Sequence, residues 1–246
     1  MKWFRILAVT LSLVVLLTTL FGCGPKSGIF PDPHLEAAIR EAINKPEGPI
    51  YTSDLEALTT LEAQDRGILD LTGLEYCVNL ELLQLGNNNI SDISPLASLT
   101  NLTMLTLERN QIRDISPLAG LTNLELLLLG NNNISDFSAL AGLTNLWLLG
   151  LRSNNISDIS PLAGLSNLER LNLSGNNISD ISALAGLTKL EVLDLNNNNI
   201  SDILPLVEND GLSAGDTVDL SGNPLSTTSV NVYIPQLEAR GVAVTY

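Results

Sequence analysis

The sequence predicts an α/β solenoid whose short strands stack into one parallel β-sheet lining the concave side of a horseshoe-like arc. The first observation is the pattern L-x-x-L-x-L-x-x-N-x-I, which returns every 22 residues, with copies starting at Leu80, Leu102, Leu124, Leu146, Leu168 and Leu190. The second is that aliphatic fourth and sixth positions flank an outward fifth position, which is the periodicity of a strand. One unit cannot bury its own leucines, so neighbouring units must stack.

The N-terminal residues predict a targeting signal rather than part of the folded domain. Lys2 and Arg5 precede an uncharged apolar run that extends to Phe21, which is the arrangement of an export signal. A transmembrane helix is the alternative, because the run approaches the roughly 20 residues that span a bilayer. The run ends in Leu-Phe-Gly-Cys, which resembles the bacterial lipobox, although Phe21 departs from its usual small residue. The resemblance implies a signal peptide over 1–22 and lipidation of Cys23.

Residues 23–28 then form a short tether, and residues 29–54 are predicted to be a helical N-terminal cap. Asp32-Pro33 is typical of a helix start. The helix would place its apolar side chains on one face, namely Leu35, Ile39, Ala42 and Ile43.

The repeats are predicted to occupy residues 55–225. A weaker first copy starts at Leu58, and the last copy carries three extra residues before Val218. The second half of each unit returns along the convex side, where Ser-Pro pairs such as Ser94-Pro95 predict a 3₁₀ or short helical turn with serine as its N-cap. Cys77 occupies a leucine position, so we expect a buried free thiol.

Residues 226–246 are predicted to be a C-terminal cap made of a helix and a strand. Helix 233–240 would have Pro235 in its first turn and Gly241 as its stop. The alternation of Val242, Val244 and Tyr246 predicts the final strand. Caps of this kind protect the open ends of a solenoid.

The repeated pattern is the leucine-rich repeat signature, and the chain resembles the bacterial, internalin-type class with short repeats. The resemblance covers residues 55–225 and, because the pattern recurs so strictly, is specific. It implies that the concave sheet recognises a ligand.

An asparagine occupies the ninth position of seven copies, where the strand bends into a turn and leaves backbone groups that need partners. We therefore expect a structural asparagine ladder formed by Asn88, Asn110, Asn132, Asn154, Asn176, Asn198 and Asn223. Asparagines at the tenth position, such as Asn89 and Asn133, should lie exposed in the turn with unusual dihedral angles. A second row, which includes Asp92 and Asp114, invites a calcium interpretation. Lone carboxylates that accept backbone N–H bonds explain the row better, because the ligand spacing of a calcium loop is missing.

Composition excludes several functional classes. Without residues 1–22 the chain carries 10 basic and 27 acidic side chains, a net charge of −17, which opposes nucleic-acid binding. His34 is the sole histidine, and no nucleophile–base pair, phosphate loop or cluster of metal ligands is apparent. We expect neither catalysis nor a cofactor or metal.

The outward positions of the concave sheet carry the candidate site. An apolar stripe of third- and fifth-position side chains, beside Trp147, is large enough to signal a binding surface. Arginines could orient the ligand and acidic side chains would border it. The predicted ligand-binding residues are Leu82, Met104, Leu126, Leu128, Trp147, Leu148, Arg109, Arg152, Arg170 and Asp194. Near-identical copies also allow the stripe to be a relic of duplication.

These observations predict a monomeric binding module, held outside the cytoplasm of a bacterium by an N-terminal lipid, that recognises a protein. Two alternatives remain open at the level of sequence. One is a structural spacer of the envelope that binds glycan, although Trp147 would be the one aromatic side chain on the concave face. The other is inhibition of a secreted enzyme with a basic surface, for which the acidic rim would provide salt-sensitive affinity.

Overall fold

The computed structural model describes residues 28–246. The predicted signal peptide, Cys23 and nearly all of the tether lie outside the described residues. Within residues 28–246, no helix is long and apolar enough to cross a membrane.

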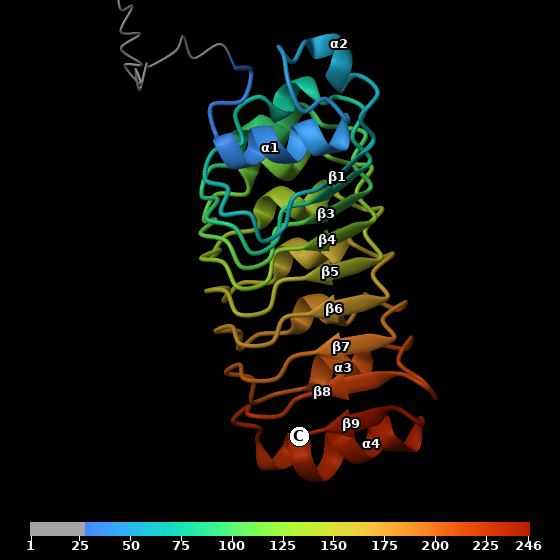
Figure 1. Cartoon of the computed structure of the whole chain (residues 1–246). Coiled ribbons are helices and arrows are strands. Elements are labelled where there is room, and N and C mark those ends of the chain that lie inside the picture. Colours follow the sequence, from blue (N-terminus) through green and yellow to red (C-terminus); the bar gives the residue numbers. More distant parts are fainter. Residues whose placement is uncertain (1–27) are drawn as a thin grey trace, which may run out of the picture.

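A single sheet of parallel strands runs the length of the molecule, with each strand beside the next one in the chain (Figure 1). The fold class predicted from the repeat is therefore confirmed. The strands are β1 (Thr60–Glu62), β2 (Leu82–Gln84), β3 (Met104–Thr106), β4 (Leu126–Leu128), β5 (Leu148–Gly150), β6 (Arg170–Asn172), β7 (Val192–Asp194), β8 (Thr217–Asp219) and β9 (Ala243–Thr245).

Strand register follows the repeat. Leu105 pairs with Leu127, and Leu127 with Leu149, so equivalent positions form straight rows across the sheet. At the end of the array Leu193 pairs with Val218, 25 residues on instead of 22. The three extra residues therefore loop out before β8 without shifting the register of the sheet.

Short helical turns form the opposite side of the solenoid. They are η1 (Leu74–Tyr76), η2 (Ser94–Ser98), η3 (Ser116–Gly120), η4 (Ser138–Gly142), η5 (Ser160–Gly164), η6 (Ser182–Leu184) and the α-helical α3 (Leu204–Glu208). The predicted serine N-cap is wrong, because Ser94 is already the first residue of its turn and its N–H donates to Asp92 Oδ1 at 2.8 Å. The row of aspartates thus accepts backbone N–H bonds, as expected. Each aspartate bonds the N–H group at the start of a turn, which is the capping role predicted for serine.

The core fills the space between the sheet and these turns. Apolar side chains, most of them leucine and isoleucine, form one continuous buried cluster that extends from Phe30 to Val242. Cys77 lies within it as a buried free thiol. Burial raises the pKa of Cys77 to about 12, so this cysteine packs as a small hydrophobic side chain.

The N-terminal end is covered by α1 (Pro33–Ala42), whose N-cap is Asp32, followed by α2 (Thr52–Leu55). The helix start is as predicted. The buried face differs by one turn, because Ala38 packs inward beside Leu35 and Ile39 while Ala42 is exposed.

The C-terminal end is covered by a π-helical turn, η7 (Ser229–Tyr233), that continues into α4 (Ile234–Ala239) and then β9. Helical structure therefore begins before the predicted start at residue 233. Gly241 ends it with φ of 89°, as expected. The Arg240 guanidinium donates to the carbonyl oxygens of Val207 at 2.6 Å and Asn209 at 3.1 Å, which ties this cap to the last repeat.

Candidate functional site

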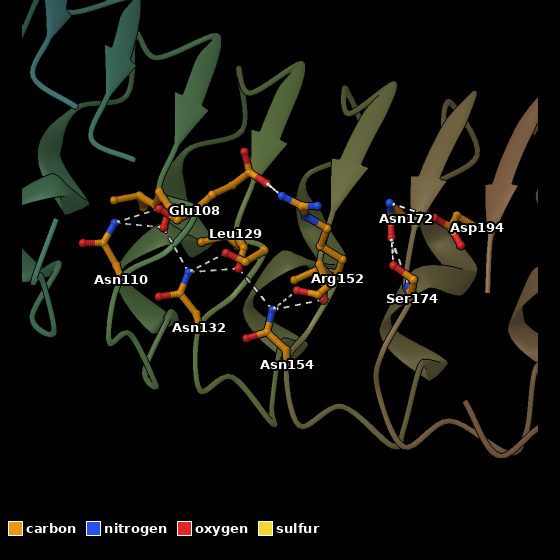
Figure 2. A network of polar contacts seen from close by, with 12 residues as sticks. Glu108, Asn110, Leu129, Asn132, Arg152, Asn154, Asn172, Ser174 and Asp194 are labelled. Carbon is orange, nitrogen blue, oxygen red and sulfur yellow. Dashed lines mark hydrogen bonds and ion pairs between the residues drawn. The ribbon is translucent and has the colours of Figure 1, made fainter. Parts of the chain in front are cut away.

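Six of the seven ninth-position asparagines, from Asn88 to Asn198, form a buried file beneath the ends of the strands, and the seventh, Asn223, is half-buried (Figure 2). Asn132 is representative. Its Nδ2 donates to the carbonyl oxygens of Leu107 and Leu129, and its Oδ1 accepts from the Ile112 N–H at 3.0 Å. Each asparagine therefore joins its own repeat to the one before it. These side chains fix the position of neighbouring strands relative to each other and, because they are engaged with the backbone, are not available to a ligand.

The left-handed backbone of each turn lies one residue earlier than the ladder, at the eighth position. Asn87, Asn131 and Asn197 have φ of 54° to 57° there. The expectation of unusual dihedral angles at the tenth position is therefore wrong, because Asn89 and Asn133 are exposed but have no positive φ. Arg109 occupies the eighth position of its repeat with φ of 55°, at the exposed rim of the turn.

The outward third positions of β2 to β5 form an apolar row. Leu82 pairs with Met104, Met104 with Leu126, and Leu126 with Leu148, and all four side chains are half-buried. Continuing the row, Arg170 is exposed on β6 and Val192 is half-buried on β7. We call this exposed side of the strands the sheet face.

A hollow of about 270 Å³ opens in the sheet face between β4 and β7. The backbone of Gly150 contributes to its lining, and the apolar residues of the lining are Leu128, Leu148, Leu149, Leu171 and Val192. Gly150 has a specific reason to lack a side chain, because a Cβ there would lie 2.7 Å from Leu128 Cδ2. Leu128 thus leans over the neighbouring strand, and the absent side chain leaves the hollow.

An ion pair forms one wall of the hollow. Arg152 reaches across the intervening repeat, and its guanidinium lies 3.4 Å from Glu108 Oε1 (Figure 2). The path crosses Gly130, where a Cβ would lie 2.8 Å from Arg152 Cγ. Glycine at this position is therefore what allows the pair to span two repeats.

Asp194 forms the opposite wall. It is half-buried, and its carboxylate accepts from Asn172 Nδ2 at 3.1 Å and from Asn196 Nδ2 at 2.6 Å. Burial raises the pKa of Asp194, and the nearby charge of Asp219 raises it further. Burial also raises the pKa of Asp219, but hydrogen bonds from Ser221 and Asn196 outweigh it and lower the pKa below its ordinary value.

Half of the sequence-predicted ligand residues line this hollow, namely Leu128, Leu148, Arg152, Arg170 and Asp194. Leu82, Met104 and Leu126 lie on the same sheet face, on β2, β3 and β4. Trp147 lies half-buried one residue before β5, and it and Arg109 are outside the lining.

Six lining residues were absent from the predicted set: Glu108, Leu149, Gly150, Leu171, Asn172 and Val192. Glycine at the fifth position of LWLLGL was the available signal, because the equivalent residues on the neighbouring strands are Leu128 and Asn172. No group of three or more potential metal ligands lies together within residues 28–246.

Comparison with known families agrees with this architecture. A model of paired leucine-rich repeats matches residues 78–120, 144–185 and 166–208, and a second leucine-rich repeat model matches residues 100–156. No curated protein gave a significant match.

Several solved structures are similar to this chain. Internalin C2 of Listeria monocytogenes is 38% identical with a TM-score of 0.80, and the match covers 88% of this chain and 94% of that one. A leucine-rich repeat protein of Leptospira interrogans is 26% identical with a TM-score of 0.73, and the match covers 80% of this chain and 51% of that one. The chain therefore belongs to the leucine-rich repeat proteins of internalin type.

Proposed function

We propose that this protein is a monomeric binding module, rather than an enzyme, that recognises a protein partner through its sheet face. The observation that carries the proposal is the apolar row of four half-buried side chains, which leads directly into the hollow. With strands about 4.8 Å apart, four of them place the ends of the row roughly 14 Å apart.

The arrangement fits a protein interface because its apolar centre is surrounded by charged groups. Arg152, Glu108, Arg170 and Asp194 stand around the apolar surface of the hollow. Protein interfaces commonly have an apolar core and a polar rim. The internalin-type repeat, a typical protein-interaction module, supports the same interpretation.

The test is capture of a partner by a fragment of residues 28–246. Leu128→Ser/Trp147→Ala removes two candidate anchors, and we expect it to weaken capture by about tenfold or more, because each buried anchor contributes more than about 1 kcal/mol. The matched control is Tyr76→Ala/Val78→Ser, which removes exposed apolar side chains in and beside η1. Equal capture by all three proteins would show that the partner binds elsewhere. Capture of wall glycan instead of protein would favour the envelope spacer.

We further propose that the mature protein begins at Cys23 and is held outside the cytoplasm by a lipid on that cysteine. The support is the apolar run that ends in Leu-Phe-Gly-Cys. One acyl chain gives marginal membrane binding, so two or three are needed for a stable anchor. Cys23→Ala should leave the signal uncleaved and the lipid absent, which mass spectrometry detects. The idea fails if the mature mass is the same in both proteins.

A further inference from the structure

We propose that the hollow between β4 and β7 receives the side chain of a lysine or arginine from the protein partner. The aliphatic stem would lie on Leu128, Leu148 and Val192, and the cation would lie beside Asp194. The identity of the partner rests on the proposed function, whereas the preference of the hollow for a cationic side chain is a property of this chain.

The surface of the hollow suits the stem of such a side chain. Its apolar lining comes from leucines of β4, β5 and β6 and from Val192 of β7, and Gly150 adds backbone without a side chain. Lysine and arginine bury their methylene stems on surfaces of this kind while the charged head remains near water.

The charges of the hollow favour a cation at its β7 side. Among the charges that act on Asp194, the repulsion from Asp219 exceeds the attraction from Arg152. Arg152 is already engaged by Glu108. Asp194 is therefore a half-buried carboxylate that forms no ion pair with another described residue, and its hydrogen-bond donors are the neutral amides of Asn172 and Asn196. An incoming ammonium or guanidinium group would supply the missing charge.

The competing occupant is an acidic side chain held by Arg170, which is exposed and forms no ion pair with another described residue. The charge of the whole molecule opposes it. Residues 1–27 contain three basic and no acidic side chains, so the formal charge of −15 becomes −18 for residues 28–246. A field of this sign attracts cationic partners and repels anionic ones.

The test uses the full chain with labelled leucine and valine methyl groups and three small probes, each a blocked amino acid. N-acetyl-lysine methylamide should shift the methyl resonances of Leu128, Leu148 and Val192 in a saturable way, with a Kd on the order of 1 mM for a ligand of this size. N-acetyl-norleucine methylamide, which keeps the stem without the charge, should bind at least about fivefold more weakly. N-acetyl-glutamate methylamide should bind more weakly than both.

Asp194→Asn should remove the preference for lysine over norleucine while leaving the norleucine affinity unchanged. Glu191→Gln is the matched control, because it removes one charge from the same repeat without touching the hollow. The proposal is overturned if norleucine binds as well as lysine, if glutamate binds best, or if no saturable shift occurs up to about 50 times the expected Kd. Because no partner is present, these outcomes are independent of whether the sheet face captures a protein.

Discussion

At the scale of the residue, Asp32 shows how one carboxylate can join two parts of the molecule. It is 5% exposed. It accepts the N–H groups of His34 and Leu35 in α1, and those of Leu69 and Asp70 in the first repeat. Burial alone would raise the pKa of Asp32, but the four backbone hydrogen bonds outweigh it and lower the pKa below 3.8. The charged form of Asp32 is therefore the one that stabilises the fold.

We predict that Asp32→Ala lowers the free energy of unfolding at pH 7 by about 2 kcal/mol, because it removes a helix cap and leaves buried N–H groups without a partner. Since the folded pKa is depressed, this contribution is present above the unfolded value near 3.8 and is lost as the pH falls through the folded pKa. Urea unfolding of both proteins between pH 7 and pH 2 measures it. A difference that does not shrink toward low pH would contradict this account.

At the scale of the element, the motif LGNNNISD, which occurs at residues 85–92 and 129–136, divides its asparagines among three roles. Asn87 takes the left-handed backbone, Asn88 is buried in the ladder, and Asn89 is exposed. Leucines and asparagines that recur every 22 residues predicted the strands and the buried asparagine ladder, because the same positions are buried in each repeat. Which exposed residue has positive φ was not predictable, since both neighbours of Asn88 are asparagine and both face water.

Substitution in the middle of the array separates these roles. Asn132→Ala leaves the carbonyl oxygens of Leu107 and Leu129 and the N–H of Ile112 without their partner. We expect a loss of about 3 kcal/mol in the free energy of unfolding, since several buried groups lose a hydrogen bond. Asn133→Ala, one residue on and exposed, should change it by less than about 0.5 kcal/mol. Urea unfolding gives both values, and similar losses would mean that the ladder is not what stabilises the turn.

The candidate site was also predictable only in part. Alternation along the strands correctly placed Leu128, Leu148, Arg170 and Asp194 on one face. The hollow itself depends on Leu128 leaning over Gly150 and on Arg152 crossing Gly130 to reach Glu108. These are conformations of side chains from different repeats, which no spacing within one repeat encodes.

At the scale of the whole molecule, the core is long and continuous, but each repeat packs mainly on its two neighbours. The molecule was largely predictable at this scale because the same unit is used again and again. The ends were predicted less well, since α1, α2 and η7 do not repeat and their boundaries follow from contacts with a single neighbouring repeat. In an array of this kind, stability is close to a sum of repeat and interface terms.

Because the repeats are stacked in a line, two equally destabilising substitutions should unfold different lengths of the molecule, depending on where in the array they lie. Leu127 on β4 and Leu237 on α4 are both fully buried, and replacing either with alanine should cost about 2–5 kcal/mol locally. Leu237→Ala should open the C-terminal end alone, so amide hydrogen exchange would accelerate in β8 and β9 while β3 to β5 keep their protection. Leu127→Ala should lower protection on both sides of β4, because the array must break in its middle. If Leu237→Ala lowered protection in β3 to β5 as much as in β8, the molecule would instead unfold as one cooperative unit, and the stability of the sheet face would depend directly on the C-terminal cap.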